Sequence, residues 1–131
     1  MPTHDARRGT VRPVLIVEDD ESARESYAAL IEQILGLPVV TAEDGKRALD
    51  LLREGLQPGL IVLDLSMPHM DGVTFREQQL ADPTLAHAPV VVCSAVLDSA
   101  TQLERLKASA YLQKPVEPAV LLRLVRAFCE L

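Results

Sequence analysis

The feature that most constrains the fold of this chain is a regular alternation of short apolar runs with longer stretches of helical spacing. The runs are Val14–Val17, Val39–Thr41, Leu60–Leu63, Val90–Cys93 and Tyr111–Leu112. Short runs that are apolar at nearly every position are typical of strands buried on both faces of a sheet. The alternation therefore predicts an α/β fold of the (βα)5 type, in which helices cover both faces of a five-stranded parallel sheet.

The stretches between the runs carry helix signals. After the first run, apolar residues recur at helical spacing until Gly36, which we expect to end that helix. Ser22 precedes Glu25 by three residues, a spacing that predicts a capping box at the start of this helix. The remaining helices are expected to end near Gly55, to run from Gly72 to Ala81, to carry Leu103 and Leu106, and to begin at Pro118.

Length and composition narrow the class of protein. The 131 residues suit one domain, which we expect at residues 11–131 after a flexible polar tail at residues 1–10. A net charge of −6 argues against direct binding of nucleic acid, which needs clustered basic residues. Cys93 and Cys129 are expected to be buried reduced thiols, and no apolar stretch is long enough to span a membrane, so a cytoplasmic location is expected.

Polar side chains follow four of the five predicted strands. Glu18 and Asp19 follow the first, Asp64 the third and Ser94 the fourth, and Lys114 comes after the fifth. The carboxyl ends of parallel strands lie at one edge of a sheet, and ligands bind at that edge. We therefore expect these side chains to lie together, although they are far apart in sequence.

These residue types indicate a particular chemistry. Glu18, Asp19 and Asp64 supply hard oxygen ligands of the kind that Mg²⁺ prefers. Ser94 could donate a hydrogen bond to a phosphoryl oxygen, and Lys114 could pair with the same group. Attack by a free oxygen of Asp64 on phosphorus would then give an aspartyl phosphate.

At these residues the chain resembles the receiver domain of two-component response regulators, the CheY-like fold. The similar segments are Val17–Asp19, the loop from Leu63 to Gly72 (LDLSMPHMDG), Cys93–Ala95 and Tyr111–Pro115. The resemblance covers residues 11–131 and implies a flavodoxin-like strand order of 2-1-3-4-5. It also implies a cis peptide bond between Lys114 and Pro115.

The resemblance implies a role for each site residue. Asp64 would accept phosphate from a histidine kinase or a phosphotransfer protein and become 4-aspartylphosphate. Mg²⁺ would be held by Asp19, Asp64 and the backbone carbonyl of Ser66, with Glu18 acting through water. Ser94 and Lys114 would bind the phosphoryl oxygens.

Tyr111 would turn inward as Ser94 moves toward the phosphate. This switch would reshape the surface formed by the fourth helix, the fifth strand and the fifth helix, which would control an unknown protein target and could pair two copies of the chain. The chain would then be a phosphoacceptor that gains and loses its own phosphate, either alone or as the receiver part of a larger regulator, rather than an enzyme with turnover.

Some positions depart from the family pattern. Lys107 and Ala110 stand where glycine is frequent, Val116 replaces a common aromatic residue, and the segment from Ser94 to Tyr111 is slightly short. Val96, which cannot hold a water molecule, predicts a long-lived phosphorylated form. The departures at Lys107, Ala110, Val116 and the short segment affect the choice of partner and remove no chemical group of the site, whereas Val96 affects the lifetime of the phosphorylated form.

The sequence leaves three alternatives to weigh against this function. A pseudo-receiver that acts as a constitutive protein-interaction module is the main alternative, although the intact acidic pair, Asp64, Ser94 and Lys114 argue against it. A haloacid dehalogenase type phosphatase also uses an aspartate after a strand, but it needs a second aspartate two residues later as general acid, where this chain has Ser66. A nucleotide-binding fold is disfavoured because no glycine-rich loop follows the first strand.

Overall fold

The computed structural model describes residues 11–65, 71–85, 87–95, 104 and 106–129. The expected tail at residues 1–10 and most of the expected helix around Leu103 lie outside these ranges. Within them, no helix is long and apolar enough to cross a membrane.

One parallel sheet of five strands organises the chain. The strands are β1 (Val14–Val17), β2 (Val39–Ala42), β3 (Leu60–Asp64), β4 (Val90–Ser94) and β5 (Ala110–Gln113). Their order in the sheet is β2-β1-β3-β4-β5, and every neighbouring pair is parallel. Both the predicted fold class and the strand order are confirmed.

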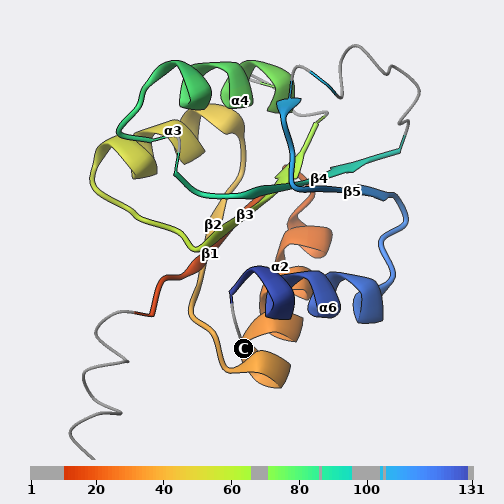
Figure 1. The fold of residues 1–131 in the computed structure, drawn as a ribbon. Helices are drawn as coiled ribbons and strands as arrows, with labels where there is room; N and C mark the ends of the chain where they lie inside the picture. The colour runs from red at the N-terminus through yellow and green to blue at the C-terminus, as the bar shows by residue number, and fades with distance from the viewer. Residues whose placement is uncertain (1–10, 66–70, 86, 96–103, 105, 130–131) are drawn as a thin grey trace, which may run out of the picture.

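Helices cover both faces of the sheet (Figure 1). Helices α3 (Gly45–Arg53) and α4 (Gly72–Ala81) lie on one face, whereas α2 (Glu21–Leu30) and α6 (Pro118–Phe128) lie on the other. A single π-helical turn, η1 (Ile31–Leu35), continues α2 and ends at Gly36, which has a φ of 68°. Gly36 ends this helix as predicted, because glycine adopts the left-handed conformation without a steric penalty.

The start of α2 differs from the prediction. Asp20, not Ser22, is the N-cap residue, and its side chain accepts a hydrogen bond of 2.8 Å from the backbone nitrogen of Ala23. The predicted capping box at Ser22 is therefore wrong. Aspartate caps a helix as well as serine does, and because β1 ends at Val17, the helix can already begin at Glu21.

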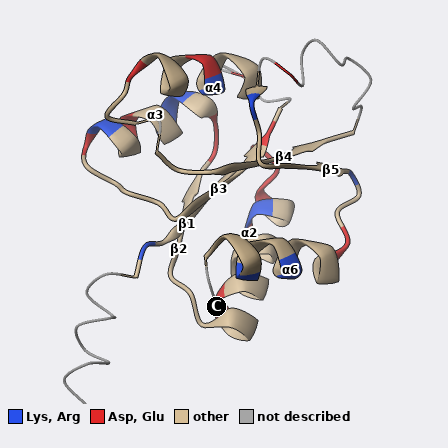
Figure 2. Ribbon diagram, viewed as in Figure 1, with Lys and Arg blue, Asp and Glu red and all other residues tan. Residues whose placement is uncertain are grey.

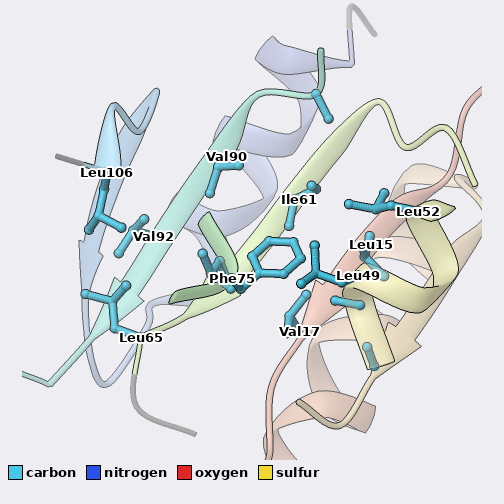
Figure 3. Packing of buried hydrophobic residues seen from close by; sticks show 14 residues of the cluster. Leu15, Val17, Leu49, Leu52, Ile61, Leu65, Phe75, Val90, Val92 and Leu106 are labelled. Atoms are coloured by element: carbon cyan, nitrogen blue, oxygen red, sulfur yellow. The ribbon is translucent and has the colours of Figure 1, made fainter. Parts of the chain in front are cut away.

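Two aliphatic layers hold the helices on the sheet. Figure 3 shows the layer under α3 and α4, where Phe75 of α4 lies among Val17, Leu49 and Ile61. The layer under α2 and α6 includes Ile16, Ile31, Val62, Leu121 and Val125. Odd and even positions of each central strand face opposite layers, which explains why these strands are apolar throughout. Cys93 is buried in the second layer as predicted, but Cys129 is only partly buried.

Candidate functional site

The strand register brings the predicted site residues to one edge of the sheet. Val17 of β1 pairs with Leu63 of β3, so Glu18 and Asp19 continue beside Asp64. Asp64 in turn pairs with Cys93, the residue before Ser94. Ser94 pairs with Gln113, and the backbone nitrogen of Lys114 donates a hydrogen bond of 2.8 Å to the carbonyl oxygen of Ser94. The register therefore aligns residues that are up to 96 positions apart in sequence.

Three carboxylates form an acidic cluster at this edge, defined here as Glu18, Asp19 and Asp64. One ligand oxygen from each lies within 4.8 Å of the others. Glu18 and Asp64 are only 2% and 4% exposed, whereas Asp19 is exposed to solvent. Figure 2 shows the acidic segment (red) between β1 and α2. Buried carboxylates this close repel one another, so the cluster favours binding of a cation.

Lys114 supplies a positive charge to this cluster. Its ammonium nitrogen lies 2.9 Å from Oε1 of Glu18 and 3.3 Å from Oδ2 of Asp64. Burial disfavours the charged ammonium, but the hydrogen bond to Glu18 and the negative charges of Asp64 and Glu18 outweigh it and raise the pKa of Lys114 above its ordinary value. Lys114 is therefore charged at neutral pH and holds two carboxylates in place. The peptide bond that follows it, to Pro115, is cis, as the resemblance implied.

Ser94 and Tyr111 lie on the neighbouring strands β4 and β5. Ser94 is 8% exposed at the end of β4, on the side of Val90 and Val92. Tyr111 of β5 is half-buried and packs against the same layer of aliphatic side chains. Because Val92 pairs with Tyr111, the predicted hydroxyl and aromatic switch residues lie on neighbouring strands. Tyr111 is thus two positions in register away from Ser94.

Gly72 has no room for a side chain. Its backbone nitrogen donates a hydrogen bond of 2.9 Å to the carbonyl oxygen of Leu65. A Cβ atom at this position would collide with the carbonyl oxygen of Asp64 and would lie 2.7 Å from Cα of Leu65. The first turn of α4, capped by the side chain of Asp71, therefore packs directly on the backbone that carries Asp64.

One supporting residue was missed in the sequence. Arg24 of α2 donates hydrogen bonds from Nη1 to the carbonyl oxygens of Glu18, at 3.0 Å, and Asp19, at 3.4 Å. It thereby fixes the backbone that carries two of the three carboxylates. An arginine one turn into a helix that follows an acidic segment was a signal for this contact, since the first turn lies over the preceding loop.

Two predicted positions lie outside the described residues. They are Ser66, whose carbonyl was expected to bind the metal, and Val96, which was expected to slow hydrolysis. The predicted metal ligands Glu18, Asp19 and Asp64 all lie in the acidic cluster.

A separate hollow lies at the opposite edge of the sheet, next to the amino ends of β1, β3 and β4. Its volume is about 390 Å³, and Arg12, Pro58, His87 and Ala88 are among the residues that line it. None of the charged strand-end residues described above lines it. The chemistry of the carboxyl edge therefore does not depend on this hollow.

Comparison with known proteins identifies the family. The family model described as the response regulator receiver domain matches residues 14–126. The chain belongs to this family. The match spans the whole sheet of this receiver domain and every described residue of the acidic cluster, together with Ser94, Tyr111 and Lys114.

The receiver domain is similar to parts of larger regulators. It is 33% identical over 120 residues to a probable transcriptional regulator of Guillardia theta, covering 90% of this chain and 45% of that protein. It is 36% identical over 117 residues to the response regulator PleD of Caulobacter vibrioides, covering 87% of this chain and 25% of PleD. The chain thus spans less than half the length of these two relatives.

A solved structure supports the same assignment. The phosphorylated cyanobacterial phytochrome response regulator RcpA matches the receiver domain with a TM-score of 0.74 and 29% identity, covering 91% of each chain. Receiver domains are phosphoacceptors in signalling, they interact with histidine kinases or phosphotransfer proteins, and they bind Mg²⁺ at an acidic cluster. This receiver domain is a phosphorylation-controlled signalling switch.

Proposed function

We propose that this receiver domain accepts a phosphoryl group on Asp64, in a reaction that depends on Mg²⁺, from a histidine kinase or a phosphotransfer protein. The observation that carries the proposal is the imbalance of charge at the carboxyl edge. Three carboxylates lie within 4.8 Å of one another, and two of them contact the ammonium of Lys114. Such a cluster is costly to bury unless a cation or a reaction requires it.

The donor set fits a magnesium ion. Asp19 and Asp64 would bind the metal, Glu18 would act through water, and the carbonyl of Ser66 would complete the protein ligands. Arg24 adds a positive charge nearby, but it binds backbone oxygens and leaves the carboxylates available. When bound, Mg²⁺ supplies positive charge that neutralises the carboxylates and the oxygens of the phosphoryl group.

The side chains of the domain would carry out the transfer. A carboxylate oxygen of Asp64 forms the new bond to phosphorus while the phosphorus–nitrogen bond to the donor histidine breaks, and the imidazole keeps that electron pair and takes up a proton. Lys114, which contacts both Glu18 and Asp64, is positioned to pair with a phosphoryl oxygen. The hydroxyl of Ser94 would donate a hydrogen bond to another.

The acyl phosphate would serve as a signal that a partner recognises, and the domain would not hydrolyse phosphoesters with repeated turnover. Ser66 stands where a phosphatase of the haloacid dehalogenase type needs a second aspartate, so no general acid is available there. The movement of Ser94 toward the phosphate and of Tyr111 inward would alter the surface of β5 and α6 and of the segment before β5. A downstream protein or a second copy of the chain would bind this surface.

Incubation with acetyl phosphate and Mg²⁺, followed by intact-mass measurement, tests the proposal. The wild-type protein should gain the mass of one phosphoryl group, and chelation of Mg²⁺ should prevent the gain. Asp64→Asn should gain nothing, whereas the matched variant Asp50→Asn, on α3, should behave as wild type. A wild-type protein that gains no mass would instead be a pseudo-receiver.

A further inference from the structure

Helix α4 carries two polar side chains into an otherwise aliphatic layer. Arg76 is 5% exposed and Gln79 is fully buried, on the helix that also contributes Phe75 to the core. A buried guanidinium is costly unless its donors are all satisfied by good acceptors. These two residues are not among those that carry the phosphoryl chemistry, so their contacts call for a separate explanation.

Two of the three hydrogen bonds of Arg76 lead away from its own helix. Its Nε donates a hydrogen bond of 2.7 Å to the carbonyl oxygen of Leu106, and its Nη2 donates one of 3.0 Å to that of Lys107. Its Nη1 donates one of 2.7 Å to Oε1 of Gln79, whose Nε2 donates one of 2.9 Å to the carbonyl oxygen of Leu85. All four acceptors are neutral oxygens, and three of them are backbone carbonyls.

Two of these carbonyls belong to the backbone that leads into β5. Lys107 has a φ of 48°, the left-handed conformation that disfavours side chains, at a position where the resemblance leads one to expect glycine. The two hydrogen bonds from Arg76 hold this turn without glycine. Leu106 is fully buried, and Figure 3 shows its side chain beside Val92 in the layer that also contains Phe75.

The same turn determines where Tyr111 lies. Ser109 donates a backbone hydrogen bond of 2.8 Å to Val90, and β5 begins at the next residue. Tyr111 packs against the layer that contains Leu106. Burial lowers the pKa of Arg76, and the negative charge of an ionised Tyr111 side chain would oppose this shift.

The other end of α4 contacts the phosphoacceptor strand. Gly72 packs on the backbone of Asp64 and Leu65, and Arg76 follows one helical turn later. A single helix therefore touches the backbone of Asp64 at one end and the turn before β5 on its buried face. Because a helix turn is rigid, α4 connects the backbone of Asp64 to this turn through few intermediate residues.

We propose that Arg76 is a positioning residue of the switch, which holds the carbonyls of Leu106 and Lys107 and thereby sets where β5 presents Tyr111. The inference rests on the proposed function, because the switch it serves is that of an Asp64 phosphoacceptor. Gln79 supports Arg76 by accepting one of its hydrogen bonds and anchoring the pair to Leu85.

Fluorine NMR of protein labelled with 3-fluorotyrosine tests this role. The chain has two tyrosines, Tyr27 and Tyr111, so two resonances are expected and Tyr27→Phe assigns them. In Arg76→Met the Tyr111 resonance should move or broaden in the unphosphorylated protein. Addition of acetyl phosphate and Mg²⁺ should then shift the Tyr111 resonance by about half or less of the wild-type amount. The reason is that, without Arg76, Tyr111 would no longer have one defined position before phosphorylation and another after it.

Matched variants separate positioning from stability. Arg53→Met makes the same chemical change at an exposed arginine of α3 and should leave the Tyr111 resonance in place. Arg76→Met combined with Gln79→Leu removes both polar partners, so it should recover stability while the Tyr111 resonance stays displaced. Arg76→Lys keeps the positive charge but lacks the planar guanidinium group that reaches both carbonyls. This variant replaces Arg76→Met in the NMR experiment if Arg76→Met does not fold.

The proposal is overturned if folded Arg76→Met or Arg76→Lys keeps the wild-type Tyr111 resonance. It is also overturned if the double variant regains that resonance together with its stability, since the shift would then reflect lost stability alone. A protein that gains no phosphate in mass measurements contradicts the proposed function, but the resonance of its unphosphorylated form still decides whether Arg76 positions Tyr111.

Discussion

Lys114 is partly buried and Arg76 is almost fully buried, and the protein stabilises these two cationic side chains in opposite ways. Lys114 lies against the carboxylates of Glu18 and Asp64, at an edge where negative charge is in excess. Arg76 donates its hydrogen bonds to neutral oxygens of Gln79, Leu106 and Lys107. A cation whose hydrogen bonds all go to neutral carbonyl oxygens, such as Arg76, holds the backbone in place. A cation among an excess of carboxylates, such as Lys114, leaves net negative charge that can bind a further cation and, with it, a phosphoryl group.

The largest effect on stability is expected from Arg76→Met. It leaves the carbonyls of Leu106 and Lys107 and the amide of Gln79 without their donor, which should lower the free energy of unfolding by about 3 kcal/mol. Adding Gln79→Leu should recover part of this loss, because it replaces the unpaired amide oxygen of fully buried Gln79 by an unpaired carbonyl oxygen of Leu85, which is only partly buried. Urea denaturation of the three proteins measures the difference, and a double variant less stable than the single one would contradict the explanation.

Lys114→Met should lower the free energy of unfolding by about 2 kcal/mol, because two buried carboxylates lose the ammonium between them. The comparison predicts that Mg²⁺ restores much of this loss, since it would replace the missing positive charge, whereas Arg76→Met should gain no more from Mg²⁺ than wild type does. Thermal unfolding with and without millimolar Mg²⁺ separates the two. If Mg²⁺ raises the melting temperature of both variants equally, the proposed difference between the surroundings of Lys114 and Arg76 is contradicted.

Gly72→Ala tests the helix that joins the two regions. The added Cβ would meet backbone atoms of Asp64 and Leu65 that cannot move cheaply, so a loss of about 1–2 kcal/mol and slower phosphorylation are expected. Gly59→Ala is the matched control, because its Cβ would lie 3.4 Å from the nearest atom, at ordinary contact distance. If both variants are equally stable and equally phosphorylated, the contact of α4 with Asp64 does not position the site.

The pH dependence of stability should report on Lys114. Its pKa is raised in the folded protein, so this contribution to stability is fully present below the ordinary value of 10.5 and decreases as the pH rises beyond it. The wild-type protein should lose at most about 1.4 kcal/mol per pH unit there from this group, and Lys114→Met should lack that part of the slope. Denaturation curves between pH 9 and about 11.5 check the sign.

The smallest effect on folding is expected from Asp19→Asn. Asp19 is exposed, so the free energy of unfolding without metal should change by less than about 0.5 kcal/mol. Binding of Mg²⁺, measured by calorimetry, should nevertheless weaken clearly, because one of the three carboxylates is lost. Unchanged affinity for Mg²⁺ would remove Asp19 from the proposed ligands.

The residues of the carboxyl edge could be found in the sequence because each lies just after a short apolar run that predicts a strand. Asp64 after Leu60–Leu63 and Lys114 after Tyr111–Leu112 were recognisable without coordinates, since the direction of parallel strands places both at one edge. The N-cap of α2 was misassigned to Ser22 because both Asp20 and Ser22 are suitable N-cap residues. The sequence does not show at which residue β1 ends and the helix can begin.

The sequence alone determined the fold class, the edge of the sheet that holds the chemistry and the types of group gathered there, because strand and helix periodicity and parallel direction are local properties that repeat along the chain. Only the tertiary structure decided that Lys114 bridges Glu18 and Asp64, that Gly72 must lack a side chain, and that Arg76 reaches the carbonyls of Leu106 and Lys107. The partners of Arg76 lie about 30 residues away in sequence, and no periodicity encodes which backbone oxygens a buried guanidinium will meet once the layers pack.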